Sequence, residues 1–97
     1  MEITISPLEQ QEFQDLLTIS AVSDETKAVL QKQFDSNAID SHTFFSLLYI
    51  LREEDRLDRE MQKYAAELAN FDPVAYTQRL KEVVEGEIQK YLAAKAA

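Results

Sequence analysis

His42 is the side chain of this protein best suited to metal binding, and it is the only histidine in the sequence. It stands near the expected start of a helix, where a neutral imidazole could ligate a metal ion. No carboxylate lies at the helical spacing that would complete a site with it, and the chain has no cysteine to supply a thiolate. The sequence therefore predicts that His42 is a surface residue.

A run of acidic side chains could also hold a metal ion or perform acid–base chemistry. Its members are Glu53, Glu54, Asp55, Asp58 and Glu60. Three arginines, at positions 52, 56 and 59, are interleaved with them, so neutralisation within one helix explains the cluster. We expect no metal and no cofactor here.

Other catalytic patterns are missing from the sequence. One glycine, one histidine and no cysteine leave no phosphate-cradling glycine loop, catalytic triad or redox pair. Basic stripes with interleaved aromatics, which are typical of nucleic-acid binding, are missing as well. We therefore expect neither an enzyme nor a nucleic-acid partner.

The segment IDSHTFFSLLYILREE, residues 39–54, is similar to the region of acyl and peptidyl carrier proteins in which a serine at a helix start carries phosphopantetheine. The resemblance implies that Ser41 would be this serine. It covers 16 residues, and it departs from the family pattern because His42 replaces an apolar residue, the preceding glycine is missing and the expected helix is too long. A carrier-like domain modified on Ser41 is the third of our functional hypotheses.

The charge of the chain is acidic and unevenly placed. The net charge is −8 over 97 residues; residues 1–40 carry eight acidic and two basic groups, whereas residues 71–97 carry four of each. This balance disfavours binding to phosphate backbones and anionic lipid. No apolar stretch reaches the roughly 18 to 20 residues of a membrane span, and MEITISPLEQ lacks the features of a signal peptide. We expect a cytoplasmic protein with no membrane partner.

Two short helices are predicted at the N-terminus. Ser6, Pro7 and Glu9 form a helix start with a capping box, and this helix ends near Thr18. Ser23 caps the second helix, which a polar turn over residues 35–40 follows. The apolar positions of the two helices are Leu8, Phe13, Leu16, Leu17, Val22, Val29, Leu30 and Phe34.

A long third helix begins at Asp40 or Ser41 and meets no proline or glycine before Asn70. About 29 residues span roughly 43 Å, which exceeds the roughly 32 Å diameter of a compact chain of this length. Asp72 and Pro73 start a fourth helix, which reaches about Leu92, with Phe71 and Tyr76 as a hydrophobic staple.

The short connection between the third and fourth helices makes them an antiparallel hairpin. We therefore predict an all-α, four-helix single domain in which two short N-terminal helices pack on a long antiparallel helical hairpin. Residues 1–52 and 80–97 form the head, and residues 53–79 form a protruding hairpin.

The third helix changes character along its length. Residues 44–51, FFSLLYIL, are apolar on every side except at Ser46, so we expect them in the centre of the head. The pattern then narrows to a coiled-coil seam at Leu57, Met61, Tyr64, Leu68 and Phe71. The same steps place Glu54 in the seam, where we expect it to snorkel at an edge, with a basic partner or a register break as alternatives. Expected ion pairs on the flanks are Asp55–Arg59, Arg56–Glu60 and Lys63–Glu67.

The fourth helix has a wider apolar stripe than one neighbour can cover, because Val83 and Val84, and Tyr91 and Leu92, are adjacent apolar pairs. We expect a small acidic protein–protein interaction module, such as an adaptor, an assembly chaperone or a structural subunit. It would bind another protein, or itself as a homodimer, through helix faces. The expected contact residues are Tyr64, Leu68, Tyr76, Leu80, Val83 and Tyr91.

A second hypothesis is an inhibitor or antitoxin-like decoy, whose acidic face occupies a basic groove on its target. The acidic residues that would lead this face are Glu9, Glu12, Asp15, Asp24 and Glu25. Binding by exposed charges weakens steeply from low to physiological salt, whereas apolar docking barely changes, so the two hypotheses differ in salt response.

Overall fold

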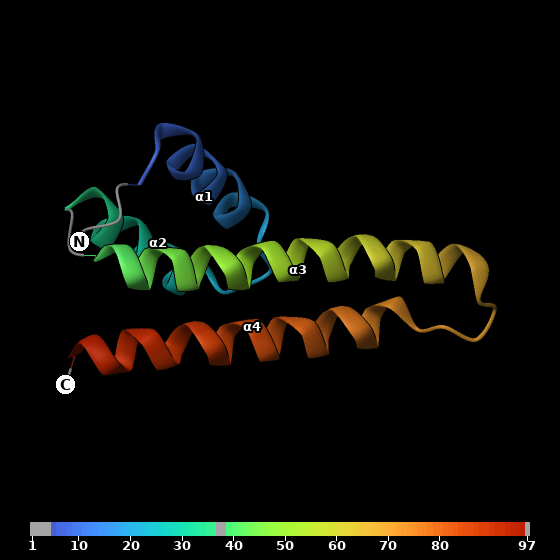
Figure 1. Ribbon diagram of the computed structural model, residues 1–97. Helices are drawn as coiled ribbons and strands as arrows, with labels where there is room; N and C mark the ends of the chain where they lie inside the picture. Colours follow the sequence, from blue (N-terminus) through green and yellow to red (C-terminus); the bar gives the residue numbers. More distant parts are fainter. Residues whose placement is uncertain (1–4, 37–38, 97) are drawn as a thin grey trace.

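The computed structural model describes residues 5–36 and 39–96, and these residues form four α-helices with no strand among them (Figure 1). The helices are α1 (Pro7–Ile19), α2 (Asp24–Asp35), α3 (Ser41–Glu67) and α4 (Pro73–Ala96). The predicted all-α, four-helix class is confirmed. Residues 37 and 38 of the predicted turn lie outside the described residues.

Side-chain caps start the helices where the sequence predicts. The Ser6 hydroxyl accepts from the Glu9 N–H at 3.2 Å while the Glu9 carboxylate accepts from the Ser6 N–H, which completes the capping box of α1. Ser23 caps α2, and Asp40 caps α3 by accepting from the Thr43 N–H at 2.7 Å. Asp72 accepts from the two backbone N–H groups of residues 74 and 75 at the start of α4.

Two helix ends differ from the predicted ones. Helix α3 has 27 residues and ends at Glu67, three residues before Asn70. Helix α4 continues beyond Leu92 to Ala96, because the alanine-rich C-terminal segment has high helix propensity.

Helices α3 and α4 run antiparallel as a long hairpin, and α1 and α2 lie against the half of α3 that begins at Ser41 (Figure 1). The other half of α3 projects beyond α1 and α2, and among the described residues only the first half of α4 accompanies it. The molecule measures 49 × 28 × 21 Å, so it is elongated along the hairpin. The exact division between head and protruding hairpin stays a prediction.

The core lies where all four helices meet. Its aromatic centre is formed by Phe13, Phe34 and Phe44, whose ring centroids are 5.1 to 6.1 Å apart. The other buried apolar residues of this core are Leu17, Val22, Leu30, Leu47, Leu48, Leu51, Val84 and Ile88.

Three of the predicted apolar positions are exposed and do not contribute to the core. Leu8 is 84% exposed because it lies about 140° around α1 from Phe13, and Val29 is exposed because it lies about 100° from the buried Leu30. Tyr49 is 65% exposed and lies opposite the side of α3 that faces the core. Residues 44–51 are therefore not enclosed on every side; the neighbouring helices leave the face at Tyr49 open.

Candidate protein-binding surface

The hairpin tip, residues 62–79, buries very little of its surface. Met61 is the last buried residue of α3, and every residue from 62 to 70 is exposed. In residues 71–79, which include the start of α4, only Phe71 and Tyr76 are half-buried. Two helices alone cannot enclose a core, so apolar side chains in this part of the molecule face solvent.

An aromatic cluster closes the tip. Phe71, in the connection between α3 and α4, lies between Tyr64 and Tyr76, with ring centroids 6.2 Å and 5.6 Å away respectively. The predicted staple of Phe71 and Tyr76 is thus present as a ring contact. Tyr64 is still 42% exposed and Leu68, at the end of α3, is 53% exposed, so the cluster leaves apolar surface uncovered.

A shallow groove runs along α3 and α4 next to this cluster. It is lined by Leu57 of α3 and by Tyr76, Arg79, Leu80 and Val83 of α4. Val83 is 56% exposed, whereas its neighbour Val84 is buried in the core. Within the residues that the structure describes, the guanidinium of Arg79 has no ion-pair partner. The groove therefore offers apolar surface beside one uncompensated cation.

The six predicted contact residues divide into two sets. Tyr64, Tyr76, Leu80 and Val83 are brought together by the aromatic cluster and the groove, and Leu68 lies at the exposed end of α3. Tyr91 lies elsewhere, because it packs against the core near the C-terminal end of α4. Sequence reasoning missed Val74, which is exposed directly after Pro73, and Arg79, which stood outside the apolar stripe.

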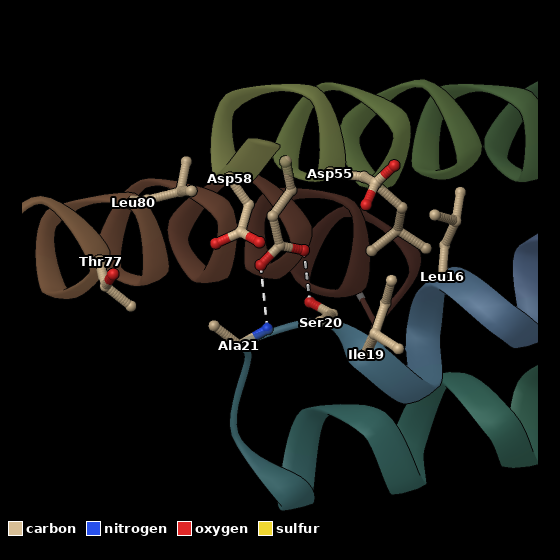
Figure 2. Close-up of a pocket in the computed structure, with 10 residues that line it drawn as sticks. Leu16, Ile19, Ser20, Ala21, Asp55, Asp58, Thr77 and Leu80 are labelled. Atoms are coloured by element: carbon tan, nitrogen blue, oxygen red, sulfur yellow. Dashed lines mark hydrogen bonds between the residues drawn. The ribbon is translucent and has the colours of Figure 1, made fainter. Parts of the chain in front are cut away.

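A separate hollow of the surface lies where α1 ends against the hairpin (Figure 2), and Glu54 is one of the residues that line it. Glu54 is only 6% exposed, and its carboxylate accepts hydrogen bonds from the Ser20 hydroxyl at 2.6 Å and the Ala21 N–H at 2.9 Å. The predicted snorkelling was wrong, and neither a basic partner nor a register break replaces it. The segment between α1 and α2 crosses α3 at this point and supplies the donors that a buried carboxylate needs.

A second carboxylate holds the same segment. Glu85 of α4 accepts from the Ser23 N–H at 3.0 Å, from the Ser23 hydroxyl at 3.1 Å and from the Thr26 hydroxyl. The hydrogen bond from Thr26 keeps the pKa of Glu85 below its ordinary value, against the opposing effect of burial. Residues 20–23 are thus clamped by one carboxylate from each helix of the hairpin, which docks α1 and α2 onto it.

The hollow beside Glu54 measures about 100 Å³ and has acidic side chains at its edge. These carboxylates already have partners: Asp55 pairs with Arg59 at 2.9 Å, and Asp58 accepts from Gln62. Among the described residues, no group of three or more metal-ligating side chains converges, and His42 is exposed in the first turn of α3. The ion pair of Asp55 and the hydrogen bond of Asp58 indicate that these carboxylates stabilise the fold.

The predicted flank pairs form in two cases of three. Asp55–Arg59 and Arg56–Glu60 are ion pairs at 2.9 Å. Lys63 and Glu67, both in the described part of α3, do not pair, so that prediction was wrong. Exposed long side chains near a helix end gain little from pairing.

The acidic residues of the decoy hypothesis are partly engaged within the chain. Glu9 completes the capping box, and Glu12 binds Arg52 through two hydrogen bonds of 2.6 and 2.8 Å, which lower the pKa of Glu12. Asp15 accepts from Gln11 at 2.9 Å. Asp24 and Glu25 are exposed in the first turn of α2.

Along the described residues, none of the helices combines the length and apolar content that crossing a bilayer requires. Comparison of the chain with protein-family models, with curated protein sequences and with solved structures finds no significant match.

Proposed function

We propose that the protein is a small acidic interaction module that binds a protein partner through the α3–α4 hairpin. One observation carries the proposal: Leu47, Leu48 and Leu51 of α3 are buried in the head, yet the same hairpin keeps Tyr64, Leu68 and Val83 exposed. Exposed apolar side chains that gather on one surface mark contact sites in small domains.

The shape of the hairpin supports recognition by helix faces. A shallow groove between two helices accepts an apolar stripe from another helix, and the exposed valine and tyrosine side chains supply the matching contacts. Adaptors, assembly chaperones and structural subunits act in this way without a catalytic pocket. We accordingly propose a non-enzymatic role in the cytoplasm.

The decoy and carrier hypotheses gain less support. Three of the five acidic residues proposed for the decoy face already accept hydrogen bonds within the chain, so fewer free charges remain for a basic groove. Ser41 is the first residue of the uninterrupted 27-residue α3, which is longer than the carrier pattern implies.

Site-specific photo-crosslinking in the native cells, and in a lysate of these cells adjusted to low and to physiological salt, tests the proposal. A photoreactive amino acid at Val83 reports on the groove, and the same amino acid at Leu8, which is more exposed, is the matched control on α1. We expect a discrete crosslinked species from position 83 and none from position 8. Its yield should stay nearly constant from low to physiological salt, because apolar docking is weakly screened.

Two results would overturn the proposal. Equal crosslinking from both positions would mean that contact follows exposure alone. A discrete species only from a photoreactive group at Asp24 or Glu25, with a yield that falls steeply with salt, would favour the decoy function instead.

A further inference from the structure

Gly86 is a glycine that the folded chain does not need. It lies inside α4, is exposed, and a Cβ atom added to it would meet no other atom within 4 Å. Glycine in a helix interior lowers stability by roughly 0.5 to 1 kcal/mol relative to alanine. No close contact among the described residues therefore requires a glycine at this position. A glycine here would, however, let the backbone of a second helix approach α4 closely.

Gly86 belongs to a continuous outer face of α4. We define this outer face as Tyr76, Arg79, Val83, Gly86, Glu87 and Lys90, which follow one another at helical spacings. Tyr76, Arg79 and Val83 line the groove described above. The outer face thus contains the exposed Val83, the guanidinium of Arg79 without an ion-pair partner among the described residues, and the open surface at Gly86.

This outer face is complementary to itself when two α4 helices lie antiparallel about a two-fold axis at Val83. Each residue then meets the one equally far beyond Val83 on the partner helix. Arg79 meets the partner's Glu87, which joins opposite charges twice by symmetry. Leu80, which lines the groove at the edge of the outer face, lies at the height of the partner's Gly86, where no side chain obstructs its approach. Tyr76 meets the partner's Lys90, and a cation and an aromatic ring attract.

We propose that the outer face of α4 is the interface of a homodimer, in which two copies of this chain pair antiparallel about Val83. The inference rests on the proposed function and names its partner. Helix α4 spans Pro73–Ala96, so an axis at Val83 lies near its middle and residues 73–93 overlap with their equivalents.

The charge distribution favours a second copy over a basic partner at this face. Residues 71–97 carry four acidic and four basic groups, while the acidic excess lies in residues 1–40. Two α4 helices can therefore approach without net repulsion. Glu87 already pairs with Lys90 at 2.9 Å on the exposed surface, and this leaves its second oxygen for the partner's Arg79.

A charge-swap experiment on the full chain tests the register. The dissociation constant is measured by analytical ultracentrifugation for the wild type, Arg79→Glu, Glu87→Arg and the double variant, with circular dichroism to confirm helicity. Each single change places like charges opposite each other, so we expect the constant to rise about tenfold or more. The double variant restores opposite charges and should return close to the wild-type value. Lys32→Glu, on α2, changes the net charge as Arg79→Glu does and should have little effect.

A cysteine variant provides an independent readout of the axis. The chain has no cysteine, so Val83→Cys introduces a single thiol that lies beside its own equivalent across the axis. We expect rapid formation of a disulfide-linked dimer, and much slower linkage for Leu8→Cys. A wild-type chain that is monomeric at every concentration, or a double charge variant no tighter than the single ones, would overturn the homodimer.

Failure of the dimer and failure of the proposed function give different results. A monomer that still crosslinks from position 83 to a different protein would refute the homodimer and keep the interaction module. A monomer with no discrete crosslink from position 83 would refute both.

Discussion

The two halves of α3 are parts of one uninterrupted helix with opposite surroundings. In the head, Leu47, Leu48 and Leu51 are enclosed by the other three helices, whereas residues 62–67 are all exposed. Glu54 stands between the two regions and is buried by the segment that joins α1 to α2. The comparison indicates that stability is concentrated in the head, and that the hairpin tip and the outer face of α4 are available for contact.

The largest difference should appear on truncating a leucine in each region. Leu48→Ala removes a fully buried side chain and should lower the free energy of unfolding by about 2 to 5 kcal/mol. Leu68→Ala makes the same chemical change at an exposed position and should alter it by less than about 0.5 kcal/mol. Urea unfolding at low protein concentration measures both, and a loss of similar size in both variants would contradict the division.

The boundary between the regions should be sensitive at Glu54. Glu54→Ala leaves the Ser20 hydroxyl and the Ala21 N–H without their acceptor in a buried place, which should cost roughly 1 to 3 kcal/mol of stability. Glu54→Gln keeps one carbonyl oxygen and should lose less. Glu60→Ala removes one surface ion pair with Arg56 and should cost under about 1 kcal/mol, so thermal unfolding should rank the three variants in that order.

Local signals in the sequence were enough to predict the helices, whereas the buried polar contacts were not. Ser6, Ser23, Asp40 and Asp72 hydrogen-bond to residues two or three positions away, so their capping role is readable from the sequence. Glu54 instead bonds to residues 33 and 34 positions away, and that contact exists only after α1 and α2 dock.

Exposure of apolar residues was predictable only in part, because it also depends on how the helices dock against one another. Tyr49 and Leu51 are both apolar members of one helical run, and the direction from which other helices approach decides which of them is covered. The adjacent pair Val83 and Val84 was predicted to widen the stripe of α4, and of the two only Val83 is exposed. The sequence alone predicts that Gly86 lowers the stability of its helix. The open space around its Cβ position could not be predicted, because it is a property of the packed structure.

A smaller effect should appear in the pH dependence of the head. The pKa of Glu85 is lowered in the folded protein. Around the ordinary pKa of a glutamate, the folded state therefore binds fewer protons than the unfolded chain. The stabilising contribution of Glu85 is complete above about pH 4.3, the ordinary value in an unfolded chain, and is lost as the pH falls through the lower folded pKa. Stability of the wild type should therefore decline in acid.

Glu85→Gln should flatten this decline and lower stability at neutral pH, measured by chemical unfolding from acid to neutral pH. Glu82→Gln, at an exposed position on the same helix, is the matched control and should follow the wild type. A Glu85→Gln profile parallel to that of the wild type would show that the clamp on residues 20–23 is not a source of the pH dependence.

The smallest expected change is a gain in stability at Gly86. Gly86→Ala places a methyl group in open space and should raise the free energy of unfolding of the monomer by roughly 0.5 to 1 kcal/mol. The same variant should associate more weakly, because the methyl group meets Leu80 of the second copy. A variant that is both more stable and equally dimeric would remove the reason given for this glycine.

Amide hydrogen exchange of the wild-type chain, measured across a wide range of protein concentration, tests the central claim most directly. If the hairpin binds a second copy through α4, protection should rise with concentration over residues 76–90 and stay constant over Pro7–Ile19 of α1. Protection that is independent of concentration throughout α4, or that rises in α1 instead, would contradict the account.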